Sequence, residues 1–257
     1  MKAHWTKKTL HFKQPAGTSR GVMKDRDVWY ITLSQDGKTG IGECAPLPGL
    51  SSDDFDQIES KLDEVCQSPG LFINDLSQLA DFPSLRFGLE MAHLDLINGG
   101  GQHCFGEFDS ININGLIWMG DEDFMVRQVE EKLADGWQCI KMKFGAIGFA
   151  KELSILRSIR KRFSREELEL RVDANGAFTK DDVHKKLDQL APFDLHSIEQ
   201  PIQQGQWELL FELCQSSPVP IALDEELITL VREKERIEML DKVKPQYLVL
   251  KPSLLGG

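Results

Sequence analysis

The chain has 257 residues, of which 41% are hydrophobic and 28% are charged, so it can bury a substantial core and should be globular. A formal net charge of −11 argues against a nucleic-acid partner and against attraction to anionic membranes. We find neither a signal peptide nor an apolar run long enough to span a membrane, so the sequence predicts a soluble, cytoplasmic protein that acts on small molecules.

The five cysteines are scattered and form no CxxC pair, which argues against a zinc site or a disulfide framework. We expect ordinary thiols in a reducing compartment.

The first hundred residues predict strands followed by helices, an α+β domain that we assign to residues 1–105. Residues 29–33 and 39–44 flank an Asp-Gly turn and should form a hairpin. One helix is expected over 53–66, with Ser52 as its N-cap. A second is expected over 84–98, ended by the three glycines that follow. Its buried side should carry Phe87, Met91 and Leu94, with Leu89 and Leu96 as further candidates.

From residue 106 to residue 257 strands and helices alternate, which favours a parallel sheet. The expected strands are 110–117, 138–143, 168–173, 195–199, 220–224 and 246–251, and the expected helices are 121–135, 147–163, 179–191, 205–216 and 229–240. A doubly wound open sheet also fits the alternation, but no glycine-rich phosphate turn follows a strand. We therefore favour a (β/α) barrel, of whose eight strands six are counted.

Charged side chains recur where these strands end. Starting at Lys143, each successive charged residue follows the one before it by 30, 26, 25 and 27 residues, which gives Asp173, Glu199, Asp224 and Lys251. Such a step is about the length of one strand, one helix and two loops. In a barrel all the carboxyl ends of the strands meet at one mouth, so these residues should converge.

Each of these residues has an ordinary explanation when it is taken alone. Lys141 and Lys143 point the same way on a strand and could be a solvated pair, and each acid could cap the next helix. Together, the three carboxylates of Asp173, Glu199 and Asp224 need a cation, and oxygen ligands suit Mg²⁺. Two neighbouring ammonium groups repel, which should lower the pKa of at least one and help it to act as a base.

The motifs KMK (141–143), VDANG (172–176), IEQP (198–201), LDE (223–225) and LKP (250–252) together resemble the muconate-lactonizing subgroup of the enolase superfamily. Within that subgroup the chain is most similar to the o-succinylbenzoate synthases, the dehydratases of menaquinone biosynthesis. The segments 17–21 and 42–51 resemble the two loops of that family's amino-terminal capping domain, which close over the substrate through Ser19, Arg20, Leu50 and Ser51.

The resemblance implies a role for each site residue. Asp173, Glu199 and Asp224 would bind Mg²⁺, with Mn²⁺ as an alternative. Lys143 would be the general base that removes the proton α to a carboxylate, and Lys141 would lower its pKa and orient the substrate. Lys251 would stabilise the ene-diolate from the other face. Asn175 and Glu225 would orient the ligands.

Three readings remain open at this point. The chain could be an o-succinylbenzoate synthase, or an N-acylamino acid racemase or dipeptide epimerase that uses Lys143 and Lys251 as paired bases. It could also be an inactive, truncated chain, because two βα units and the closing carboxyl-terminal segment of the family are not seen before Gly257. In each of these readings the ligand is a small-molecule carboxylate. The sequence leaves the oligomeric state open.

Overall fold

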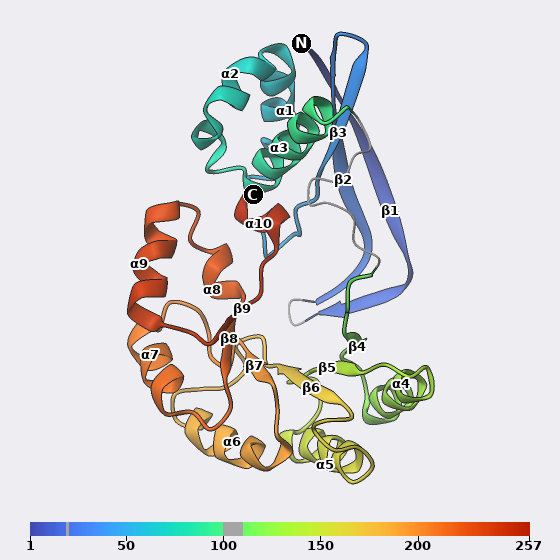
Figure 1. The fold of residues 1–257 in the computed structure, drawn as a ribbon, viewed down its shortest axis with the longest axis vertical. Helices are drawn as coiled ribbons and strands as arrows, with labels where there is room; N and C mark the ends of the chain where they lie inside the picture. Colours follow the sequence, from blue (N-terminus) through green and yellow to red (C-terminus); the bar gives the residue numbers. More distant parts are fainter. Residues whose placement is uncertain (19–20, 100–109) are drawn as a thin grey trace.

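The computed structural model describes residues 1–18, 21–99 and 110–257. Two sheets organise them, one in each half of the chain (Figure 1). The predicted boundary between residues 105 and 106 falls in the segment 100–109, outside the described residues.

The first sheet is antiparallel, with the order β1-β2-β3. Its strands are β1 (Lys2–Thr18), β2 (Gly21–Gln35) and β3 (Lys38–Cys44). The predicted hairpin is confirmed as β2 and β3: Asp36 and Gly37 adopt φ of 52° and 77°, as its two-residue turn requires. The long strand β1 was not anticipated by the sequence pattern.

Helices cover one side of this sheet (Figure 1). They are α1 (Ile58–Gln67), α2 (Pro69–Asn74), the 3₁₀ turn η1 (Leu76–Leu79) and α3 (Pro83–Ile97). The predicted start of the first helix was wrong. The carboxylate of Asp54 accepts hydrogen bonds from the backbone N–H groups of Asp56 and Gln57, at 3.0 and 3.3 Å. This side-chain turn takes the place of a helical turn, so the helix begins at Ile58 and Ser52 is not its cap.

The extent of α3 is confirmed within one residue, and its predicted buried side is confirmed at Leu89 and Leu96 but was wrong at Phe87, Met91 and Leu94. Its buried apolar residues are Leu85, Leu89, Ala92 and Leu96, whereas Leu94 is 40% exposed. A side chain at Gly42 of β3 would overlap the carbonyl oxygen of Gly88 in α3. The sheet therefore accepts the face of the helix that carries small residues, and the larger side chains Phe87 and Met91 are turned partly toward solvent.

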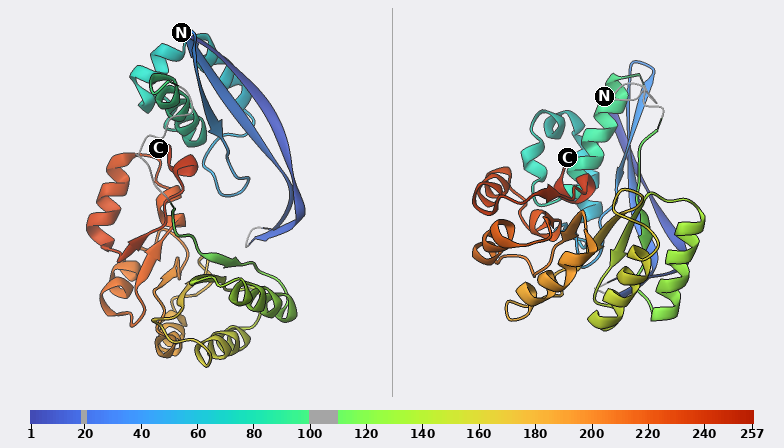
Figure 2. Two further views of the ribbon diagram at one scale, coloured as in Figure 1. Left: turned by 45° about the vertical axis from the view of Figure 1, so that its right-hand side comes forward. Right: turned by 60° about the horizontal axis from the view of Figure 1, so that its bottom comes forward.

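The second sheet is parallel, with strands in chain order β4-β5-β6-β7-β8-β9. They are β4 (Gly115–Ile117), β5 (Cys139–Lys143), β6 (Glu169–Asp173), β7 (Ser197–Glu199), β8 (Ile221–Leu223) and β9 (Tyr247–Leu248). Every predicted strand is found, although the first begins later and the last is shorter than expected. In the described residues the sheet curves as an arc whose edges are β4 and β9 (Figure 2).

The helices between these strands line the outer face of the arc (Figure 2). The five predicted helices correspond to α4 (Glu122–Ala134), α5 (Phe149–Arg160), α6 (Val183–Leu190, followed by the 3₁₀ turn η2, Ala191–Phe193), α7 (Trp207–Ser216) and α9 (Glu233–Val243). Two short helices, α8 (Glu225–Ile228) and α10 (Pro252–Leu255), were not predicted. Among the described residues, no helix combines the length and the apolar composition needed to cross a membrane.

The amino-terminal sheet and helices contact the arc at two places. Leu47 and Leu50, in the loop after β3, pack against the hydrophobic core of the second sheet. The turn at the end of α10 lies against α3, where a side chain at Gly256 would meet Pro83 and Arg86. Both contacts are made on the side of the arc where α8 and α10 follow their strands (Figure 1).

Candidate metal-assisted active site

Two lysines of β5 reach the carboxylates that follow along the sheet. Cys139, Lys141 and Lys143 alternate with the buried Ile140 and Met142. Lys143 is in register with Asp173 at the end of β6, and its Nζ lies 2.7 Å from Oδ2 of that residue. Lys141 lies 3.0 Å from the same oxygen and also contacts Oε2 of Glu199. The alternation of the strand thus brings both ammonium groups to one carboxylate.

The carboxylates come from three neighbouring strands. Asp173 and Glu199 pair in register as the last residues of β6 and β7, and Asp224 follows β8 at the start of α8. All three are buried, Asp173 completely. Lys251, at the start of α10, contacts Oδ2 of Asp224. Ammonium groups therefore approach the acids from both ends of the row.

Burial and charge act in opposite directions on these groups. Burial alone would raise the pKa of Asp173, but Lys141 and Lys143 outweigh it and hold the pKa at about 2. Burial, reinforced by the charge of Asp173, raises the pKa of Glu199 although Lys141 acts against it. Burial also raises the pKa of Asp224 in spite of Lys251. A bound cation would favour the ionised form of both raised carboxylates.

The same competition between burial and charge sets the pKa of Lys141. Burial would lower the pKa of its ammonium group, but Asp173 and Glu199 raise it further than burial lowers it. The lowered pKa that the sequence led us to expect for at least one lysine is therefore not found at Lys141.

Asn175 and Glu225 extend the hydrogen-bonded network of Lys143 toward the loop after β8. The amide oxygen of Asn175 accepts a hydrogen bond from Nζ of Lys143 at 3.0 Å, and its Nδ2 donates to Oε1 of Glu225 at 3.0 Å. The backbone N–H of Asn175 also donates to Asp173, at 3.1 Å. Asn175 adopts a positive φ of 45°, a conformation that asparagine tolerates better than most residues.

The donor set fits a hard divalent cation. Oε1 of Glu199 and Oδ1 of Asp224 are buried oxygens that accept no hydrogen bond. Such acceptors are costly unless a cation or a donor satisfies them. In the described part of the chain, however, no three acidic, histidine or cysteine side chains are gathered closely enough to hold a metal ion as they stand. The lysines engage the other oxygens of these carboxylates.

Two buried residues of the site had no role assigned from the sequence. Gln200 directly follows Glu199 and is fully buried, and its side chain reaches the backbone N–H groups of Asp224 and Glu226. Glu226, 1% exposed, accepts hydrogen bonds from Gly205 and from the indole of Trp207 at 2.9 and 2.7 Å. The sequence pointed to these two residues only through their positions next to Glu199 and near Asp224. Their hydrogen-bond partners lie on neighbouring strands and loops, which the local sequence does not reveal.

The predicted capping loops are described in part. Ser19 and Arg20 lie outside the described residues. Leu50 and Ser51 belong to a tight turn in which their N–H groups donate to the carbonyl of Leu47, at 3.0 and 2.9 Å. The hydroxyl of Ser51 in turn accepts from the N–H of Leu47, at 2.7 Å, and this turn packs on the barrel core.

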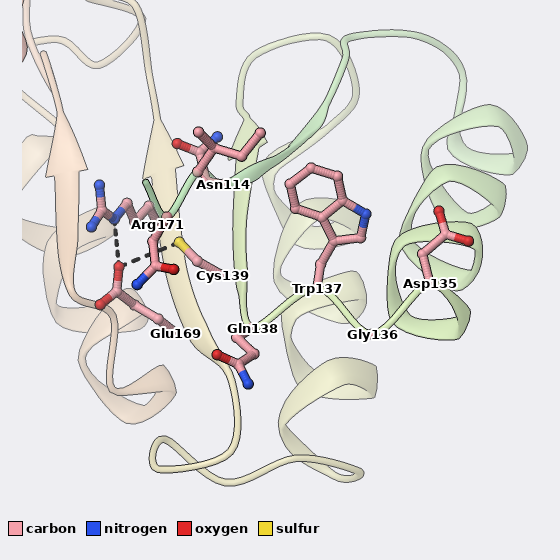
Figure 3. Close-up of a pocket in the computed structure, with 10 residues that line it drawn as sticks. Asn114, Asp135, Gly136, Trp137, Gln138, Cys139, Glu169 and Arg171 are labelled. Atoms are coloured by element: carbon pink, nitrogen blue, oxygen red, sulfur yellow. Dashed lines mark hydrogen bonds and ion pairs between the residues drawn. The ribbon is translucent and has the colours of Figure 1, made fainter. Parts of the chain in front are cut away.

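Cavities lie at both ends of the strands. One of about 860 Å³ is an open hollow bordered by the loops after β4, β5 and β6, and Asn175 is among its lining residues. One of about 370 Å³ lies inside the arc beneath Lys141 and Glu199. A third, of about 740 Å³, contains the linked side chains of Cys139, Glu169 and Arg171 (Figure 3). It lies where β5 and β6 begin, away from the carboxylates, and barrel enzymes place their chemistry at the opposite end.

Comparison with known proteins gives two family matches. Residues 124–257 match the model described as "Enolase C-terminal domain-like", and residues 11–96 match "MenC, N-terminal domain". The chain is 44% identical to an o-succinylbenzoate synthase of Desulfotalea psychrophila, over all of this chain and 80% of that protein.

Solved structures agree with these matches. The crystal structure of MenC from Desulfotalea psychrophila superposes with a TM-score of 0.87, at 40% identity, over all of this chain and 80% of that one. The o-succinylbenzoate synthase from Thermosynechococcus elongatus, whose structure has Mg in the active site, superposes with a TM-score of 0.82 at 24% identity, over 99% of this chain and 77% of that one.

Proposed function

The chain belongs to the o-succinylbenzoate synthase family of the enolase superfamily, and we propose that it catalyses the Mg²⁺-dependent dehydration of 2-succinyl-6-hydroxy-2,4-cyclohexadiene-1-carboxylate to o-succinylbenzoate, a step of menaquinone biosynthesis. The relative that is 44% identical is an o-succinylbenzoate synthase.

One observation supports this chemistry above the others. Ammonium groups stand at both ends of a buried row of three carboxylates, Lys143 on Asp173 and Lys251 on Asp224. A substrate carboxylate bound over this row would present its α-carbon between a base and a second positive charge. That arrangement suits removal of a weakly acidic proton, because the negative charge that develops is stabilised where it forms.

We propose that Asp173, Glu199 and Asp224 hold Mg²⁺, with the unpartnered oxygens of Glu199 and Asp224 among its ligands. When bound, the cation would supply positive charge next to the substrate carboxylate. The proposed role of the surrounding residues is orientation: Asn175 holds the ammonium of Lys143, and Glu225 holds the amide of Asn175.

The proton on the ring carbon next to the carboxylate would pass to Nζ of Lys143. The electron pair of the broken C–H bond would form the new ring double bond as the C–O bond at C6 breaks, and the leaving hydroxyl would take the proton back from the ammonium of Lys143 to become water. Lys251 would stabilise charge on the substrate from the other side, and Lys141 would orient its carboxylate. Leu50 and Ser51 would close the entrance from the capping domain, because their turn already packs against the barrel core.

The test is a product assay on the purified protein. We expect dehydration of the cyclohexadiene carboxylate to exceed racemization of N-succinylamino acids and epimerization of dipeptides. Lys143→Ala should lower kcat/KM for dehydration by about 10²–10⁴-fold while Mg²⁺ binding persists, because a general base contributes roughly that much. Lys180→Ala is the control, since Lys180 is an exposed lysine in the loop after β6. Predominant racemization would favour the isomerase reading, and normal turnover by Lys143→Ala would exclude that lysine as the base.

A further inference from the structure

Gln200 joins the loops that carry two of the three acids. Its Oε1 accepts hydrogen bonds from the backbone N–H groups of Asp224 and Glu226, at 3.3 and 3.2 Å. Its Nε2 donates to the carbonyl of Ile202 at 3.0 Å. The backbone of Gln200 is engaged as well: its N–H donates to Ala222 at 2.8 Å, and its carbonyl accepts from Gly176 at 2.7 Å. One residue therefore connects the ends of β6, β7 and β8.

The backbone of Gln200 adopts a conformation that is unfavourable for a glutamine. It adopts a φ of 40°, in the left-handed region that favours glycine, and its side chain has no solvent exposure. A buried amide in a strained backbone costs free energy unless its hydrogen bonds repay it. The contacts with the loop after β8 are among the bonds that offset this cost.

The loop after β8 needs an outside acceptor at this point. Asp224 and Glu226 stand at the start of α8, where N–H groups have no carbonyl of their own helix to bind. Asp224 adopts φ −128° and ψ −77°, which is neither helical nor extended, and its own side chain does not cap α8. The amide of Gln200 supplies the missing acceptor from the neighbouring strand.

We propose that Gln200 is a positioning residue that sets the direction of the Asp224 carboxylate relative to Glu199, and through it the affinity for the divalent cation. The metal part of this inference rests on the proposed function. Glu226, within the same loop, holds it to the loop after β7: its carboxylate accepts from Nε2 of Gln200 at 3.5 Å and from Gly205 and Trp207. Gln200 itself would touch neither the cation nor the substrate.

The test replaces Gln200 with Met, which keeps the length of the side chain and removes its hydrogen bonds. The matched control is Gln246→Met. The side chain of Gln246 likewise bonds to the backbone through both its oxygen and its nitrogen: it accepts from Ile221 at 2.9 Å and donates to Cys214 at 2.7 Å, at the opposite end of β8. We expect Gln200→Met to weaken Mg²⁺ binding, measured by calorimetry, at least about 10-fold, and Gln246→Met to change it less than about 2-fold.

Amide hydrogen exchange gives a second readout that needs neither metal nor activity. In the wild-type protein the N–H groups of Asp224 and Glu226 should be protected, although first-turn amides of a helix ordinarily are not. In Gln200→Met these two amides should exchange faster than in the wild-type protein while the strand amides of β8 stay protected. In Gln246→Met the exchange of these two amides should not change. If Gln200 only stabilised the fold, the amides of β8 would instead exchange faster together in both variants.

The outcomes separate the two proposals. If the wild-type protein binds no Mg²⁺, the proposed metal site fails while exchange still decides the role of Gln200. If Mg²⁺ binds and both glutamine variants bind it equally well, Gln200 does not position the site. Fast exchange of Asp224 and Glu226 in the wild-type protein would overturn the inference even if Gln200→Met does not fold.

Discussion

Lys141→Met tests whether the ammonium group and a cation compete for the same carboxylates. Lys141 is the shared partner of Asp173 and Glu199, and its side chain is 16% exposed while the acids are nearly or fully buried. Methionine keeps the apolar stem and removes the charge, so two adjacent buried carboxylates lose their common counter-charge. Removing one member of a buried ion pair costs about 3–5 kcal/mol. Because Lys141 is partly exposed, we expect about 3 kcal/mol, a fall in Tm of roughly 6–12 °C.

Mg²⁺ should reverse much of this loss. A ligand present at 100 times its Kd stabilises the folded protein by about 2.7 kcal/mol. With the ammonium removed, the carboxylates are open to the cation, so Lys141→Met should bind Mg²⁺ more tightly than the wild-type protein and gain more Tm from the same concentration. The measurements are thermal unfolding followed by circular dichroism, with and without Mg²⁺ at constant ionic strength.

The control for this variant is Lys242→Met, which removes an ion pair with Glu208 at 2.6 Å whose two side chains are 46% and 82% exposed. Water screens such an exposed pair, so its loss should shift Tm little and the shift should not depend on Mg²⁺. The reasoning is refuted if Lys141→Met loses no more stability than this control, or if Mg²⁺ raises the Tm of Lys141→Met by less than that of the wild-type protein.

Three further predictions concern the acids, a buried glutamate and the capping domain. The double variant Asp173→Asn/Glu199→Gln should show no heat of Mg²⁺ binding in calorimetry, and wild-type heat would contradict the ligand set. Burial raises the pKa of Glu152 from 4.5 to about 6, so the folded state holds its proton more tightly. Its contribution to the free energy of unfolding should fall by about 2 kcal/mol as pH rises from about 4.5 to 6. In urea unfolding, the wild-type protein should therefore lose stability relative to Glu152→Gln over this pH range, and a difference that stays constant with pH would contradict the prediction. Gly42→Ala should lower Tm strongly because its Cβ would overlap a carbonyl oxygen of α3, whereas Gly70→Ala, with open space around it, should not; equal melting of the two would contradict the close approach.

Much of the fold could be predicted because its signals are local. The Asp-Gly turn at residues 36 and 37 predicts the hairpin by itself, and the alternation of strand and helix predicts a parallel sheet. Parallel strands bring their carboxyl ends to one edge, so residues spaced like Lys143, Asp173 and Glu199 must converge there. The row of acids and lysines follows from this geometry and needs no knowledge of the loops.

Other features depend on contacts between distant parts of the chain. The buried side of α3 is decided by the glycines of β3, which admit the helix backbone, and not by the pattern of large apolar residues within the helix. The start of α1 is decided by the Asp54 side chain, which competes with the first helical turn.

The sequence by itself determined which residues gather at the mouth of the barrel, because strand period and strand order depend on local patterns. Only the tertiary structure decided how they pair: Lys141 shared between two acids, Lys251 on Asp224, and Gln200 holding the loop after β8. Each of these bonds joins residues at least 24 positions apart in the chain, for example Gln200 and Asp224. Their partners are selected by burial, because a charge or an amide removed from water must be satisfied by whatever the packed neighbouring strand presents.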